Sequence, residues 1–227
     1  MKEITLFDKT LTYYNSYETL PTKEFQRIMR EIDLLPEYAT EEEIICIVLN
    51  TKDIDLIYSI PVKIIDEILF FRKEQIKVKE LKELQILDYN VIIEKCFTDN
   101  IISFGVKKEL QQLSVNATSA ASQIINNNTD LLKSEFDKLT DEQKQIINNY
   151  NLKINEYFLL NCEKSAALYI YDFINTGKKW NRSLLFELEK AFLNMSISDA
   201  YSVAFFLIQN IGIYQNLLKN ILVAKKS

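Results

Sequence analysis

The stretch that decides the fold is VKKELQQLSVNATSAASQI, residues 106–124. Its apolar side chains recur at alternating steps of four and three residues, which is the spacing of a seam between two packed helices. Alanine occupies two of the six seam positions, so we expect a second helix to approach closely. The seam residues are Val106, Leu110, Leu113, Ala117, Ala120 and Ile124.

The residues after this seam predict its partner helix. Asn126-Asn127-Asn128 interrupts the pattern, and Thr129-Asp130 has the chemistry of a helix N-cap. Thr140-Asp141-Glu142-Gln143 matches a capping box, in which the first and last side chains each bind the other's backbone N–H. Helical periodicity then continues to Asn175-Thr176-Gly177, a left-handed stop. We therefore predict a helical hairpin whose second arm, if residues 141–175 form one helix, is about 50 Å long.

Shorter elements are predicted on both sides of this hairpin, and we expect a mainly α fold: an elongated helical bundle with a small N-terminal β element. The predicted domains are residues 1–75, a link over 76–105 and a helical part over 106–227. The shorter elements are a β-hairpin or single strand within 3–14, a helix over 23–34 capped by Thr22, helices capped by Thr40 and by Asp53, a helix over 62–75, a strand or irregular link over 76–90, a helix over 183–193, and a last helix from Ser196 or Ser198 to about Ala224.

The composition argues against catalysis. The chain has no histidine, three glycines and three prolines in 227 residues, and 48% of its residues are hydrophobic. Proton transfer at neutral pH relies on histidine, and phosphate-binding loops rely on glycine. The one Gly-Lys pair, Gly177-Lys178, lacks the further glycine and the Ser or Thr of a phosphate loop. We therefore expect a protein that is not an enzyme, with no cofactor and no small-molecule substrate; an enzyme without histidine is the third alternative.

The cysteines do not indicate a metal site. Cys46, Cys96 and Cys162 form no CxxC pair, and each lies among apolar neighbours. Such thiols are usually buried and reduced. We expect no metal ion.

The net charge of −5 is unevenly distributed. Residues 1–80 carry 11 basic and 16 acidic side chains, whereas residues 151–227 carry 9 basic and 6 acidic ones. This is not the basic balance of a nucleic-acid-binding domain, so we do not expect a nucleic-acid partner. The asymmetry would instead let one end of a subunit meet the other end of its neighbour.

One local cluster is a candidate contact site. Lys178-Lys179-Trp180-Asn181-Arg182 places the single tryptophan of the chain among three cations. In one interpretation Trp180 covers the core, beside solvated cations at a helix C-terminus. In the others, Lys178, Lys179, Trp180 and Arg182 contact a protein partner, with tryptophan as the anchor, or nucleic-acid phosphates.

Two stretches resemble small tail- and virion-assembly proteins of bacteriophages, including tail assembly chaperone-like families. The first, residues 4–71, runs from a short β segment through LPTKEF, residues 20–25, to LIYSIP, residues 56–61, and ILFF, residues 68–71. The second, residues 193–208, runs from LNMSISDA into VAFFL. Residues 76–182 depart from this pattern, which leaves open a transient chaperone or a permanent particle component. The resemblance implies no catalytic residues.

Together these features predict a non-enzymatic structural or assembly protein of a phage particle, which contacts other phage structural proteins or itself as a homo-oligomer. The alternative is a cytoplasmic regulator or inhibitor that binds one protein target. Met1–Ile4 lack the apolar core of a signal peptide, and the most apolar stretch, residues 203–223, contains six Gln, Asn or Lys residues. We therefore expect the virion or the host cytoplasm as location, without secretion by a signal peptide or a transmembrane span.

Overall fold

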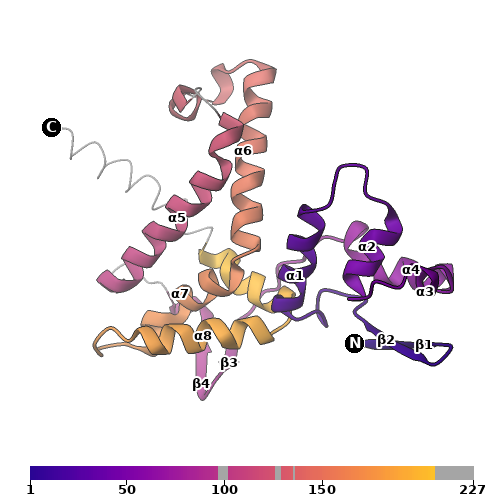
Figure 1. The fold of residues 1–227 in the computed structure, drawn as a ribbon. Helices are drawn as coiled ribbons and strands as arrows, with labels where there is room; N and C mark the ends of the chain where they lie inside the picture. Colours follow the sequence, from indigo (N-terminus) through magenta and orange to yellow (C-terminus); the bar gives the residue numbers. More distant parts are fainter. Residues whose placement is uncertain (97–101, 126–128, 135, 208–227) are drawn as a thin grey trace.

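A computed structural model describes residues 1–96, 102–125, 129–134 and 136–207, and these are mainly helical (Figure 1). The mainly α fold with a small N-terminal β element is confirmed. The elements are β1 (Lys2–Leu6), β2 (Lys9–Tyr13), α1 (Thr22–Asp33), α2 (Glu41–Val48), α3 (Ile54–Tyr58), α4 (Val62–Ile68), η1 (Phe70–Arg72), β3 (Glu83–Ile86), β4 (Tyr89–Ile92), η2 (Ile93–Lys95), α5 (Phe104–Ile125), η3 (Thr129–Lys133), η4 (Phe136–Lys138), α6 (Asp141–Leu159), α7 (Cys162–Ile174) and α8 (Arg182–Asn194). Residues 197–207 are also helical.

The N-terminal part has its own hydrophobic cluster. β1 and β2 form an antiparallel hairpin, and its inward residues Ile4 and Tyr13 pack with residues of α2, α3 and α4. Two predicted caps are confirmed here: Thr40 and Glu43 form a capping box, and the Asp53 side chain accepts from the Leu56 N–H at 3.1 Å. The predicted helix over 62–75 is wrong in length, because α4 leaves helical geometry at Leu69 and a 3₁₀ turn, η1, follows.

The main core is centred on α7, which is covered on most sides. α1, β3–β4, α8, residues 197–207, the base of α5 and the end of α6 all contribute buried side chains to it. The region 76–90, for which a strand or an irregular link was predicted, contains β3 and the start of β4. Leu84, Ile86 and Val91 of this hairpin lie inside the core.

The N-terminal part is tied to the start of the last described helix. The Thr22 N–H donates to the Met195 carbonyl at 2.9 Å, and the Ile197 N–H donates to the Leu20 carbonyl at 2.9 Å. The Thr22 hydroxyl also donates to Met195 O, at 3.1 Å. The predicted capping role of Thr22 is therefore wrong: Pro21 is the N-cap of α1, and the threonine binds a segment 173 residues away.

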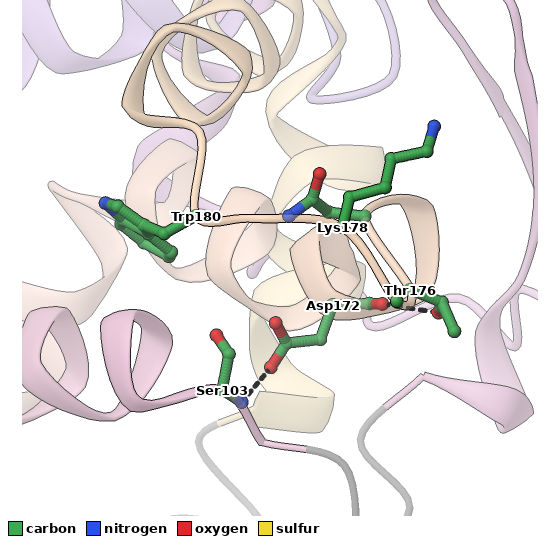
Figure 2. Close-up of a pocket in the computed structure, with 7 residues that line it drawn as sticks. Ser103, Asp172, Thr176, Lys178 and Trp180 are labelled. Atoms are coloured by element: carbon green, nitrogen blue, oxygen red, sulfur yellow. Dashed lines mark hydrogen bonds between the residues drawn. The ribbon is translucent and has the colours of Figure 1, made fainter.

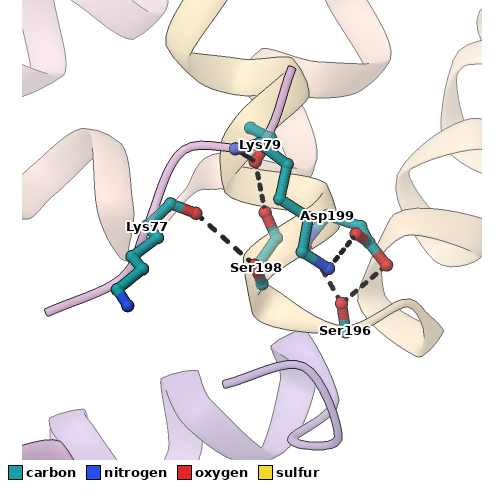
Figure 3. A network of polar contacts seen from close by, with 6 residues as sticks. Lys77, Lys79, Ser196, Ser198 and Asp199 are labelled. Atoms are coloured by element: carbon teal, nitrogen blue, oxygen red, sulfur yellow. Dashed lines mark hydrogen bonds and ion pairs between the residues drawn. The ribbon is translucent and has the colours of Figure 1, made fainter. Parts of the chain in front are cut away.

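The segment at residues 77–79 is fixed to the same helix start from another side (Figure 3). Lys79 pairs with Asp199 at 2.7 Å, and the Lys79 N–H donates to the Ser202 hydroxyl at 2.8 Å. Ser196 caps the helix by accepting from the Asp199 N–H at 3.1 Å. The predicted start at Ser196 or Ser198 agrees with this, and the predicted end near Ala224 lies outside the described residues.

α5 and α6 form the predicted helical hairpin, which rises from the core as an arm (Figure 1). The second capping box is confirmed, since Thr140 and Gln143 bind each other's backbone N–H. The prediction of one helix over 141–175 is wrong. α6 ends at Leu159, the Asn161 side chain donates to the Tyr157 carbonyl at 2.8 Å, and α7 leaves in a new direction.

Two details of the arm also differ from expectation. Ala120 is exposed, whereas Ala121 and Ile125 are buried, so the outer seam advances in steps of four. A straight helix has 3.6 residues per turn, so its buried face drifts away from a strict heptad by about 20° per repeat. Beyond the tip, the chain forms the 3₁₀ turns η3 and η4 in place of a helix that begins at Thr129-Asp130.

Candidate functional site

The predicted contact cluster lies on the loop between α7 and α8, and local hydrogen bonds shape this loop. α7 ends where Gly177 adopts a left-handed φ of +70°, as the sequence predicted. The Asn175 side chain donates to the Lys179 carbonyl at 3.0 Å, and the Lys178 N–H donates to the Asn175 carbonyl at 3.0 Å. Because the turn is tied at both ends, Lys178 and Lys179 are held at its outer edge.

The other end of the loop is fixed by a tyrosine from the core. The Tyr171 hydroxyl accepts from the Asn181 N–H at 2.6 Å and donates to the Asn181 carbonyl at 3.1 Å. The Asn181 side chain in turn caps α8, accepting from the N–H groups of Ser183 and Leu184. The backbone on either side of Trp180 therefore has little freedom.

Trp180 itself lies on the first turn of α5. Its ring packs against Tyr171, with centroids 4.7 Å apart, and against the backbone of Gly105. A Cβ atom on Gly105 would lie 2.1 Å from the indole Cε3, so this packing of the tryptophan ring requires glycine at position 105. Trp180 is 39% exposed. It covers the core, as one interpretation of the sequence held, and it also presents a large aromatic surface to solvent.

A shallow pocket of about 100 Å³ lies beside the tryptophan (Figure 2). Asp172, which lines the pocket, has a structural role: its carboxylate accepts from the Ser103 N–H at 2.7 Å and so holds the start of α5. The Lys178 side chain points away from Asp172, so the two charges form no acid–base pair (Figure 2). Pockets for small ligands are usually at least about 300 Å³, so this volume suits a few water molecules.

The structure brings the four predicted residues together and adds one that the sequence analysis missed. Lys178, Lys179 and Arg182 are exposed around Trp180. Phe104, the residue before Gly105, is 72% exposed, and Lys108 lies 5.1 Å from its ring centroid. Nothing in the local sequence connects Phe104 with Trp180, because the neighbouring Gly105 reaches the tryptophan only when α5 is placed on the α7–α8 loop. The loop and the start of α5 thus present two exposed aromatic rings and several exposed cations, which suit contact with an acidic partner.

The cysteines have little reactivity in this environment. Burial raises the pKa of the Cys96 thiol to about 12, and that of Cys162 well above its ordinary value. Burial and nearby carboxylates also raise the pKa of Cys46. All three thiols are therefore protonated at neutral pH, and the thiolate is the reactive form. Across the described residues, no group of Cys, Asp or Glu side chains has the arrangement to hold a metal ion.

Comparison with protein-family models, curated proteins and solved structures gives no match for this chain. Within the described ranges, no helix has the length and apolarity needed to cross a membrane.

Proposed function

We propose that this chain is a non-enzymatic structural or assembly protein of a bacteriophage particle, and that it works through helix-mediated protein contacts. The observation that carries the proposal is the α5–α6 arm, a pair of helices that rises from the body (Figure 1). α5 has 22 residues and is therefore about 33 Å long.

The outer half of the arm has a thin core. Ala121 and Ile125 of α5 pack with Tyr150 of α6 in a cluster separate from the main core. Ile124, Ile146 and Ile154 complete it from partly buried positions. Two helices bury only one face of each other, so most of the arm surface is available to a further helix.

Apolar side chains also lie on the outward faces of the arm. Val115 is 59% exposed and Leu152 is 60% exposed. Each is two residues beyond a buried seam residue, Leu113 or Tyr150, and so points about 200° away from the seam. A partner helix packed on either face would remove these side chains from water, which favours association.

The viral context of the proposal rests on the resemblance of residues 4–71 and 193–208 to phage tail- and virion-assembly proteins. In the structure these stretches contain β1–β2, α1–α4 and the start of the last described helix. They lie side by side, joined by the hydrogen bonds between Thr22 and Met195 and between Leu20 and Ile197. The arm comes from the central region that departs from the resemblance, and would supply the contacts particular to this protein.

The test is to locate the protein during particle production. Sedimentation of lysates from virus-producing cells, followed by detection with an antibody, should place the chain with particles or with their precursors. A Val115→Glu, Leu152→Glu variant should leave these fractions, whereas a Ser119→Glu, Asn149→Glu control, with exposed polar positions on the same helices, should remain. A chain found only as a one-to-one complex with a protein unrelated to particles would contradict the proposal and favour a regulator.

A further inference from the structure

An acidic and apolar surface lies on the loop between α1 and α2. Residues 31–51 contain six carboxylates and no lysine or arginine. Leu34 is 84% exposed and Tyr38 is 86% exposed, which makes them two of the most exposed large apolar side chains of the described chain. Two apolar side chains projecting from a strongly acidic segment form a surface suited to a partner that is both aromatic and basic.

Only some of these carboxylates are available to a partner. Glu41 pairs with Arg72 at 3.1 Å, Glu31 pairs with Arg27 at 3.2 Å, and Glu43 closes the capping box at Thr40. In the described part of the chain, no ion pair engages Glu37 or Glu42. We call Leu34, Glu37, Tyr38 and Glu42 the acidic patch.

The α7–α8 loop offers the complementary chemistry. Trp180 and Phe104 supply exposed aromatic rings, and Lys178, Lys179 and Arg182 supply exposed cations. We call these five residues the basic patch. Both patches combine large apolar side chains with charge of one sign, and the two signs are opposite.

The two patches cannot meet within one molecule. The α1–α2 loop and the α7–α8 loop lie on opposite sides of the body (Figure 1). The α2 capping box fixes the end of the first loop, and the bonds of Asn175 and Tyr171 fix the second loop. The acidic patch of one molecule is therefore free to bind the basic patch of another.

We infer that the chain associates head to tail with a second copy of itself, acidic patch to basic patch. This inference rests on the proposed function for its assembly role, and names the partner and the surfaces. Because the two surfaces differ, each bound molecule leaves one of each kind free, so the contact produces a ring if the rotation closes and a filament if it does not. Opposite charges at a partly solvated contact make the association weaker at high salt.

Complementary charge reversal tests the inference. One variant carries Lys178→Glu, Lys179→Glu and Arg182→Glu, and the other carries Glu37→Lys and Glu42→Lys; circular dichroism checks that both are folded. Light scattering over a concentration series should give an oligomer for the wild type and a monomer for each variant. An equimolar mixture of the two variants at neutral pH should restore the oligomer, because the unchanged acidic patch of one variant meets the unchanged basic patch of the other, and the two reversed patches are also opposite in sign.

A chain that carries both sets of reversals should recover self-association, since its two patches are again opposite in sign. A Tyr38→Ala variant should associate at least tenfold more weakly than the wild type. A Tyr58→Ala variant is the matched control, because Tyr58 is 69% exposed on α3, outside both patches. A wild type that stays monomeric, or an oligomer unaffected by either reversal, would overturn the inference. If the chain still sediments with particles in that case, the proposed function survives, because the arm can act without head-to-tail contact.

Discussion

Helix α7 and the α5–α6 arm are all helical but occupy opposite environments. Ten of the thirteen residues of α7 are buried, among them Ala166, Ile170 and Tyr171, whereas five of the twenty-two residues of α5 are buried. α7 is surrounded by elements from both ends of the chain, and α5 beyond its base packs mainly on α6. The body therefore carries the stability of the fold, and the arm carries accessible surface.

This difference separates the two consequences that a mutation can have. A substitution in the body should change the free energy of unfolding, because burial there is complete and close packing tolerates little change. A substitution on the outer faces of the arm should leave that free energy nearly unchanged and act on contacts with other molecules. Mutations in the two regions should separate the two effects.

Truncation of a core aromatic should have the largest effect. Phe192 on α8 is 0% exposed, and Phe192→Ala should lower the free energy of unfolding by about 3–5 kcal/mol, through lost burial and the cavity that remains. Leu152→Ala on the arm should change it by less than about 0.5 kcal/mol, because that side chain is already largely in water. Urea unfolding followed by circular dichroism measures both. Equal losses at the two sites would mean that the arm is as much a part of the cooperative core as α8.

The junction between arm and body should respond to one added methyl group. Gly105→Ala would normally favour a helix by about 1 kcal/mol. Here the new Cβ would overlap the Trp180 indole, so we expect a net destabilisation of about 1–3 kcal/mol. Trp180 is the single tryptophan, so the tryptophan fluorescence reports the environment of this ring directly. The emission should shift to longer wavelength as the ring is displaced into water. Unchanged emission together with increased stability would show that the ring does not pack on Gly105. The control is Ser119→Ala, at an exposed position on the same helix.

The two capping boxes allow the same change in each region. Thr40→Ala in the N-terminal part and Thr140→Ala at the tip of the arm each remove a side-chain acceptor for a free backbone N–H. Each should cost about 1 kcal/mol of local helix stability. Global unfolding should detect the first loss more fully than the second, because the tip can fray without unfolding the body. If Thr140→Ala lowers the global free energy of unfolding more than Thr40→Ala does, the tip of the arm does not open independently of the body.

The smallest effect is expected for an exposed ion pair of the N-terminal hairpin. The Lys9 ammonium, 2.6 Å from the carboxylate, and then the Leu56 N–H hold the pKa of Asp53 below its ordinary value. Because the folded pKa is the lower one, the ionised carboxylate stabilises the fold above the unfolded pKa of about 3.9, and this contribution disappears as the pH falls through the folded pKa. Urea unfolding at pH 6 and pH 3 should show a slightly larger loss for the wild type than for Asp53→Asn. The same loss in both proteins would mean that the pair contributes nothing; Asp55→Asn is the control.

The features that sequence reasoning predicted correctly depend on nearby residues. The caps at Thr40, Asp53 and Thr140 need partners only three residues away, and the left-handed turn at Gly177 is local as well. The wrong predictions involve hydrogen-bond partners that are distant in sequence, or a small rotation of the buried face along a helix. Thr22 has ordinary cap chemistry, but its hydroxyl binds the Met195 carbonyl across 173 residues, which no local pattern reveals.

The same division applies to the site. Trp180 and its neighbouring cations stood out because tryptophan is rare and the cations are adjacent in sequence. Phe104 did not, because the start of α5 reaches the loop only through the tertiary fold. The role of Asp172 was missed for the same reason, since its carboxylate accepts from the Ser103 N–H just before α5. The break at residues 160–161 was missed because helical periodicity continues through it. The Asn161 side chain donates to the Tyr157 carbonyl, and the chain turns there.

Amide hydrogen exchange on the isolated chain and on the associated protein tests the central claim most directly. In the isolated chain, the outer turns of α5 and α6 should exchange at least a hundredfold faster than the centre of α7, because local opening of the thin arm costs much less than global unfolding. On association with its partner, the arm should become protected while α7 changes little. Arm amides that are as slow as those of α7 in the isolated chain, and unchanged on association, would contradict the view that the body maintains the fold and the arm makes contacts.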